Sequence, residues 1–244
     1  MSFSSPEPEK IPTSSQALIV GLGNPGIRYE KTRHNIGFEA VKAFASKNGL
    51  SFKKESSLNA EIAKGSIAGI PTILLLPLTY MNRSGEAVVK TLRYFKLFEE
   101  QLRQASEVQT TGTLASLSKI PEVMLFRMLV IVDDIYTPFG SLKLKERGSS
   151  GGHNGLKDIE RHIKTQNYPR LKMGVGPLNQ DYSQRLELGQ PLEDYVLGAF
   201  TSMEMPFVNE FVENGAKVVD SWLRGDFRQA AALAGQLRFD SLTE

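Results

Sequence analysis

Five polar side chains that can orient or transfer protons lie where the predicted strands end or the predicted helices begin. They are Asn24, His34, Asn82, Asp133 and Asn154. In an α/β sheet such positions converge at the carboxyl edge of the strands, where ligand crevices form. Each residue alone has an ordinary structural explanation, since Asn caps helices and Asp follows strands. Five together, flanked by glycine and including a histidine, predict a functional site.

The available side chains restrict the chemistry of this site. The sequence has no cysteine and only three histidines, which disfavours thiolate catalysis and metal binding, so we expect no metal and no cofactor. An unperturbed imidazole has a pKa of about 6.5, so His34 can act as a base near neutral pH, and the Asp133 carboxylate can orient it. Water is then the expected attacking group. Asparagine amides can donate hydrogen bonds to a developing oxyanion, which indicates an acyl substrate.

Positive charge is concentrated in one part of the chain. The formal net charge is only +2, but the segment from Ser141 to Lys172 has eight basic residues against three acidic ones. A solvated helix face is one explanation of such a segment, and an anion or nucleic-acid site is the other. Combined with acyl chemistry, the basic segment favours a substrate that carries phosphates.

One glycine motif matches a dinucleotide fingerprint but lacks its context. Residues Gly21–Gly26 fit the pattern G-x-G-x-x-G after a predicted strand. The fingerprint requires a helix that begins at the glycines, because the pyrophosphate binds at the helix N-terminus. Residues 27–35 show no helical apolar stripe, and the helical pattern begins only near Ile36. A nucleotide-dependent oxidoreductase is therefore a rival function without positive support.

A second glycine motif matches the nucleophile elbow of serine hydrolases. Residues Gly148–Gly152 fit the pattern G-x-S-x-G. The elbow requires a buried strand that runs into the serine, and an acid and then a histidine further along the chain. Residues 143–147 are instead rich in charge, and the later histidines, His153 and His162, follow closely. We interpret this motif as a flexible loop that allows close approach of the backbone.

The order of the apolar patterns predicts an α/β fold. Short apolar runs predict strands, and apolar residues at helical spacing predict helices between them. Strands interleaved with helices are typical of a sheet that is covered on both faces. We therefore expect a single α/β/α sandwich domain with a mixed, mostly parallel twisted sheet. The expected strands are residues 17–22, 61–68, 71–76, 125–132, 142–145 and 171–175, and the expected helices are 36–45, 88–95, 156–163 and a pair within 202–237.

Composition separates a catalytic domain from two polar segments. Of the 244 residues, 41% are hydrophobic, and no apolar run approaches the roughly 20 residues of a membrane helix. Residues 1–16 are predicted to form a disordered tail, and residues 17–244 a catalytic domain. Within that domain the polar residues 99–121 predict a mobile surface insertion. We recognise no presequence, so we expect a cytoplasmic protein, with a mitochondrial location left open.

Four motifs together resemble the bacterial-type peptidyl-tRNA hydrolase family. They occur in the family's order and cover roughly residues 18–232. In combination they are much more specific than either glycine motif above. The motifs are Ile19–Gly26 followed by Tyr29 and Thr32–Asn35, then Pro77–Gly85, then Asp133 and Asp134 with Gly140, and finally Gly151–Lys157.

This resemblance implies hydrolysis of the ester between a peptide and the 3′ ribose of tRNA, which recycles tRNA from stalled translation. It implies that His34 is the general base on water, that Asp133 orients it, and that Asn24 is a further hydrogen-bonding group of the catalytic site. The implied partner is peptidyl-tRNA, with no membrane, no obligate protein partner and a monomeric state. The other implied site residues are Tyr29, Tyr80, Met81, Asn82 and Asn154 in the substrate cleft, and Lys143, Lys145 and Lys172 at tRNA phosphates.

The sequence departs from the family pattern at a few positions. Val132 stands where many members have histidine, Phe139 replaces a second proline, and residues 99–121 are extra. Lys172 stands where the family often has arginine, which keeps the charge but loses the bidentate fork. None of these changes removes a residue assigned to chemistry. A non-catalytic RNA-binding module with the same fold is a second rival, and the intact predicted catalytic residues argue against it.

Overall fold

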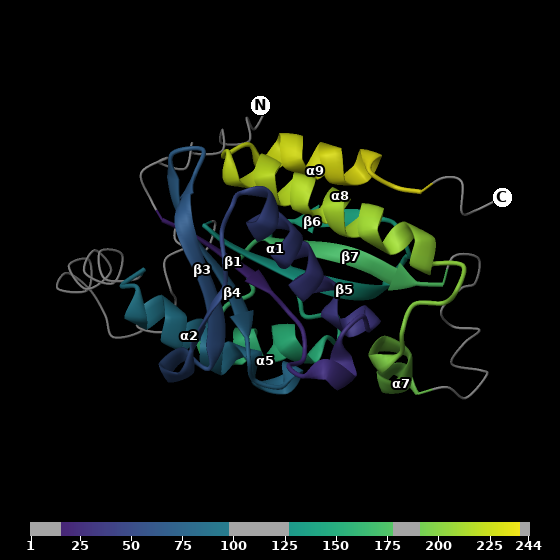
Figure 1. Cartoon of the computed structure of the whole chain (residues 1–244), viewed down its shortest axis with the longest axis horizontal. Coiled ribbons are helices and arrows are strands. Elements are labelled where there is room, and N and C mark those ends of the chain that lie inside the picture. The colour runs from purple at the N-terminus through teal and green to yellow at the C-terminus, as the bar shows by residue number, and fades with distance from the viewer. Residues whose placement is uncertain (1–15, 98–126, 178–190, 240–244) are drawn as a thin grey trace, which may run out of the picture.

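The computed structural model describes residues 16–97, 127–177 and 191–239. These residues form one seven-stranded mixed sheet with helices on both faces (Figure 1), which confirms the predicted α/β/α sandwich. The predicted tail at residues 1–16, except Gln16, and the predicted insertion at residues 99–121 lie outside the described residues. Within the described ranges, no helix has the length and apolar character that crossing a bilayer requires.

The sheet has a parallel centre and antiparallel edges. Its strand order is β2-β3-β4-β1-β5-β7-β6, and the four central strands, β4, β1, β5 and β7, are parallel. At one edge β2, β3 and β4 are antiparallel neighbours, and at the other edge β6 runs antiparallel to β7. The strands are β1 (Ala17–Gly21), β2 (Lys53–Glu55), β3 (Ala60–Ile67), β4 (Ile70–Pro77), β5 (Met128–Pro138), β6 (Leu142–Lys145) and β7 (Arg170–Gly176).

Each face of the sheet packs against its own set of helices. Successive side chains of a strand point to opposite faces, so Ile19 of β1 packs into one apolar core and Val20 into the other. Phe44 is fully buried in the first core, and burial of such a side chain contributes roughly 1.5–3 kcal/mol. The two sets of helices lie on opposite sides of the sheet in Figure 1. The first core contains α1 (Ile36–Lys47), α8 (Met205–Leu223) and α9 (Phe227–Gln236), and the second contains α2 (Ser84–Tyr94) and α5 (Asn154–Ile163).

The predicted end of the central strand is wrong. The apolar run predicts a strand that stops at Val132, but β5 continues through Asp133 and Asp134 to Pro138. Both aspartates still pair with β7 through their backbones. Their carboxylates find hydrogen-bond partners at the carboxyl end of the sheet, so the polar side chains do not interrupt the ladder. Asp133 therefore lies within the strand and not after it.

Among the described residues, one strand and one α-helix have no counterpart among the sequence-based expectations. Strand β2 consists of three exposed charged residues, which give no apolar alternation. Helix α7 (Leu192–Leu197) has only six residues, which is too short for a helical period to be recognised. Helix α7 contributes to the site described below.

Candidate active site

Helix α1 approaches the sheet closely at Gly37. A Cβ atom at this position would lie 2.5 Å from the carbonyl oxygen of Ile131, so a larger residue would force the helix away. The short 3₁₀ helix Arg33–Asn35, directly before α1, is thereby placed beside the part of β5 that contains Asp133. There His34 Nδ1 lies 2.9 Å from Asp133 Oδ1, and both residues are buried. The predicted histidine–carboxylate pair is therefore formed.

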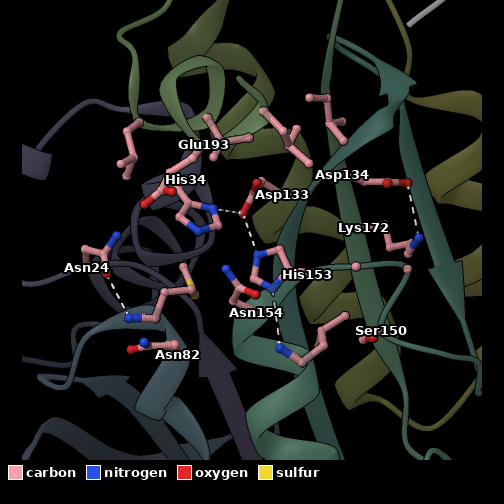
Figure 2. A pocket seen from close by; sticks show the side chains of 18 of the residues that line it. Asn24, His34, Asn82, Asp133, Asp134, Ser150, His153, Asn154, Lys172 and Glu193 are labelled. Atoms are coloured by element: carbon pink, nitrogen blue, oxygen red, sulfur yellow. Dashed lines mark hydrogen bonds and ion pairs between the residues drawn. The ribbon is translucent and has the colours of Figure 1, made fainter. Parts of the chain in front are cut away.

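A second histidine contacts the same carboxylate oxygen. His153 Nε2 lies 2.9 Å from Asp133 Oδ1, and the centroids of the two imidazole rings are 4.9 Å apart. Figure 2 shows Asp133 between the two rings. From the sequence, His153 is considered only as a possible partner of a serine, and this contact with Asp133 is not among the expectations. The position of His153 directly before a predicted helix is the one sequence signal that indicates a role in the site.

Burial and charge act in opposite directions on this cluster. Burial disfavours the charged form of His34, but the charge and hydrogen bond of Asp133, with Glu193 adding to them, raise its pKa above 6.5. Burial likewise disfavours the Asp133 carboxylate, but the charges and hydrogen bonds of the two histidines hold its pKa well below 3.8. Asp133 is thus ionised at neutral pH and can only accept hydrogen bonds. Since Asp133 accepts, the Nδ1 atom of His34 must carry a proton, which leaves Nε2 with the free lone pair.

Asn24 is held in place by two neighbours. Its backbone N–H donates to Asn35 Oδ1 at 2.8 Å, and its backbone carbonyl accepts from Asn35 Nδ2 at 2.9 Å. Its side-chain Oδ1 accepts from the backbone N–H of Met81 at 2.8 Å, as Figure 2 shows. Because the amide oxygen is engaged, the Nδ2 group of Asn24 is left to donate to a ligand. Asn35, which the sequence analysis did not single out, fixes this arrangement.

These residues surround a pocket of about 590 Å³. Helix α5 can begin close beside this pocket because residue 155 is glycine. A Cβ atom at this position would lie only 2.6 Å from Met81 Sδ. Nine of the eleven predicted site residues line the pocket: Asn24, Tyr29, His34, Tyr80, Met81, Asn82, Asp133, Asn154 and Lys172.

The three predicted phosphate-binding lysines differ in their surroundings. Lys143 and Lys145 are exposed on the edge strand β6, outside the pocket lining. Lys143 is the ladder partner of Lys172, so both side chains lie on the same face of the sheet. Lys172 lines the pocket, where its Nζ is 3.3 Å from Asp134 Oδ2. Its charge is therefore partly balanced, whereas the two edge lysines face solvent.

One member of the basic segment is structural. Arg170 is 1% exposed and lies 3.3 Å from Glu160 Oε1. Its guanidinium also donates to the backbone carbonyls of Ser149 and Gln166, and it stacks on the ring of Tyr168. This arginine anchors the loop before α5, so it adds nothing to the exposed positive charge.

Helix α7 forms one wall of the pocket beside His34. Arg33 donates from its backbone to Gly198 at 3.1 Å, and its guanidinium lies 2.6 Å from Glu204 Oε2. The same guanidinium lies over the ring of Tyr195 in α7, 4.4 Å from the ring centroid. These contacts hold α7 against the residue that precedes His34, and Glu193 of α7 lines the pocket.

The two glycine motifs have the structural roles that the sequence favoured. No α-helix begins at Gly21–Gly26, since a 3₁₀ turn follows and α1 starts only at Ile36. Ser150 lines the pocket, but no histidine in the described part of the chain hydrogen-bonds its hydroxyl. The serine therefore lacks the base that a nucleophile requires.

One set of side chains is close enough to hold a metal ion. Among the described residues, ligand atoms of His34, Asp133 and His153 lie within 4.8 Å of one another. A histidine that binds a metal ion almost always donates a hydrogen bond from its other ring nitrogen. His153 instead accepts at that nitrogen, from the backbone N–H groups of Gly155 and Leu156. The hydrogen bonds favour a proton-transfer cluster over a metal centre.

The pocket contains a buried histidine–carboxylate pair in an amide-lined cleft at the edge of a mixed α/β sheet. This arrangement is typical of hydrolytic enzymes. The family profile described as peptidyl-tRNA hydrolase matches residues 18–103 and 109–239. The chain belongs to the bacterial-type peptidyl-tRNA hydrolase family.

Individual relatives agree with this assignment. The chain is 38% identical over 212 residues to the peptidyl-tRNA hydrolase of Bacillus cereus strain Q1, which covers 87% of this chain and 95% of that protein. It is 36% identical to the enzyme of Shouchella clausii over 86% of this chain and 95% of that protein. The crystal structure of peptidyl-tRNA hydrolase from Acinetobacter baumannii superposes with a TM-score of 0.71 at 30% identity, over 93% of this chain and 96% of that chain.

Proposed function

We propose that this protein hydrolyses the ester bond between a peptide and the 3′ ribose of tRNA, and so recycles tRNA from stalled translation. The observation that carries the proposal is the buried His34–Asp133 pair at the edge of an amide-lined pocket. Membership of the peptidyl-tRNA hydrolase family supplies the substrate.

The reaction follows from the protonation states of the pair. His34 Nε2 takes a proton from a water molecule while the water oxygen bonds to the ester carbonyl carbon. Asp133 stabilises the imidazolium that forms, and the Asn24 amide, whose oxygen is engaged by Met81, donates to the oxyanion. The imidazolium then returns its proton to the 3′ oxygen of the ribose as the ester bond breaks. Peptide acid and free tRNA are the products.

The rest of the pocket binds the substrate in this proposal. Asn82 and Asn154 are exposed amides in the pocket lining, just before α2 and at the first residue of α5, and can pair with peptide main chain or with the 3′-terminal nucleotide. Tyr29, Tyr80 and Met81 provide apolar surface in the cleft.

Release of free tRNA from an aminoacyl-tRNA with a blocked amino group tests this function directly. We expect turnover of diacetyl-lysyl-tRNA by the purified protein. Binding of the substrate without turnover would instead identify a non-catalytic RNA-binding module. Quenching of tyrosine or Trp222 fluorescence by NAD(P) would favour the oxidoreductase rival.

The pH dependence of hydrolysis should report the state of His34. Because Asp133 raises the pKa of His34 above 6.5, the base is protonated and inactive up to a higher pH than a free imidazole. We expect kcat/KM to rise with pH through a midpoint above 6.5. A profile measured at constant ionic strength checks this, and a midpoint at or below the ordinary value would contradict it.

Lys143 and Lys145 should bind tRNA phosphates through the exposed edge strand β6. Replacing both with alanine should weaken peptidyl-tRNA binding and reduce the slope of log K against log salt by about 1.4 to 1.8, because two phosphate contacts are lost. Titrations at several salt concentrations measure this slope.

The opposite edge of the sheet provides a matched control. Lys53 and Lys54 of β2 are likewise two exposed lysines on an edge strand. Replacing them with alanine changes the net charge equally but should leave the slope close to that of the parent. Equal slopes for both double variants would remove Lys143 and Lys145 from the tRNA site.

A further inference from the structure

The hydrogen bonds of His153 determine which of its nitrogens carries a proton. His153 is the N-cap of α5, and its Nδ1 accepts from the backbone N–H groups of Gly155 at 3.2 Å and Leu156 at 3.3 Å. Two N–H donors can point only at a lone pair, so Nδ1 has no proton. A flipped ring would place carbon atoms against these donors and against Asp133. The orientation of the ring is therefore fixed by helix α5.

The other ring nitrogen must then be the donor. His153 Nε2 lies 2.9 Å from Asp133 Oδ1, which is ionised and can only accept. His153 consequently carries its proton on Nε2. His34 donates to the same oxygen from Nδ1, so the two histidines have opposite tautomers around one carboxylate.

We propose that His153 is a positioning residue for the hydrolytic reaction. Helix α5 fixes its tautomer, and its Nε2–H group holds the Asp133 carboxylate in place beside His34. The same hydrogen bond weakens the electrostatic effect of the Asp133 charge on His34. This inference rests on the proposed role of His34 as the general base. Without the His153 donor, the Asp133 charge would stabilise the His34 imidazolium more strongly. His34 would then stay protonated at neutral pH and could not accept a proton from water.

Several charged groups contribute to the environment in which His34 titrates. Asp133 of β5 and Glu193 of α7 favour its charged form. On the other side of the pocket, Asp134 of β5 and Lys172 of β7 balance each other as an ion pair. The tyrosines that line the same pocket are Tyr29, Tyr80 and Tyr136.

Two substitutions separate the donor function of His153 from its capping function. In His153→Asn, the side-chain oxygen takes the place of Nδ1, and Asn is among the best N-cap residues, but no donor reaches Asp133. In His153→Gln, the amide nitrogen takes the place of Nε2, but the cap acceptor is lost. The first variant keeps the helix end and removes the hydrogen bond, and the second does the reverse.

The proposal gives opposite expectations for these two variants. For His153→Asn we expect a thermal midpoint near that of the parent, a loss of about 10-fold in kcat/KM at neutral pH, and an acid limb shifted to higher pH. For His153→Gln we expect lower thermal stability but an acid limb close to that of the parent. If His153→Asn keeps the parental midpoint of the pH profile, or if both variants lose activity equally at every pH, His153 has only a structural role.

A spectroscopic measurement tests the tautomer without relying on activity. Nitrogen chemical shifts of ¹⁵N-labelled imidazoles distinguish Nδ1–H from Nε2–H. Above the midpoint of the pH profile we expect Nε2–H for His153 and Nδ1–H for His34. His162 serves as an internal reference, because its Nδ1 lies 2.8 Å from the carbonyl oxygen of Asp158 and must donate. An Nδ1–H tautomer or an imidazolium at His153 would overturn the inference, whereas the proposed function stands or falls on the His34 variant.

Discussion

Replacement of His34 by alanine is expected to lower kcat for peptidyl-tRNA hydrolysis by about 10²- to 10⁴-fold, which is the usual contribution of general base catalysis. The variant retains the pocket and its asparagines but has no imidazole to take the proton from water. KM should change much less, because the groups proposed to bind the substrate are untouched. Single-turnover release of tRNA from an N-blocked aminoacyl-tRNA measures the chemical step.

A second histidine provides the control for this experiment. His162 lies on α5, does not line the pocket, and contacts a backbone carbonyl and the carboxylate of Asp158. His162→Ala should hydrolyse the substrate at nearly the parental rate. Parental kcat in a well-folded His34→Ala protein would show that the proposed mechanism is wrong.

The convergence of the main site residues could be predicted from the sequence. Asn24 follows β1, and Asp133 lies just past the residues of β5 that pair with β1, its parallel neighbour in the sheet. Apolar runs identify such buried strands well, and the polar residues at their ends then share one edge. The same reasoning placed His34 and Asn154 at helix starts, where the structure has them.

The contact between His153 and Asp133 could not be predicted in the same way. It depends on how closely α5 packs against the segment that contains Met81, and this distance is set by the absence of a Cβ at Gly155. Such a contact between distant segments leaves no periodic signal in the sequence. The wall formed by α7 was missed for a related reason, since its position depends on the buried Arg33–Glu204 ion pair.

A count of charges also could not separate binding residues from structural ones. Arg170 and Lys145 are ladder partners on adjacent strands. Nevertheless the arginine is buried with Glu160 and the lysine is exposed. The difference arises because β6 is the edge strand and β7 is covered by its neighbours on both sides. Strand order, which the sequence does not supply, decides which of the two can reach a phosphate.

The effect of Asp133→Asn is expected to be on the order of 10²-fold in kcat, because hydrogen bonds to a charged group contribute about 1.5–3 kcal/mol and one tenfold step in rate corresponds to about 1.4 kcal/mol. Both histidines contact the same oxygen, Oδ1. An asparagine can therefore keep both hydrogen bonds through its own oxygen, so the substitution removes the charge while it preserves the geometry. The imidazolium that forms on His34 during the reaction then loses its counter-ion.

The pH profile distinguishes this loss of charge from a loss of structure. Since Asp133 raises the pKa of His34, its replacement by the neutral amide should move the acid limb of kcat/KM to lower pH. This direction is opposite to that expected for His153→Asn, although both substitutions alter the same hydrogen-bonded cluster. Asp134→Asn, which removes a charge that faces Lys172, should leave the midpoint in place. An acid limb that shifts upward in Asp133→Asn, or one that shifts equally in both aspartate variants, would mean that Asp133 does not control the protonation of His34.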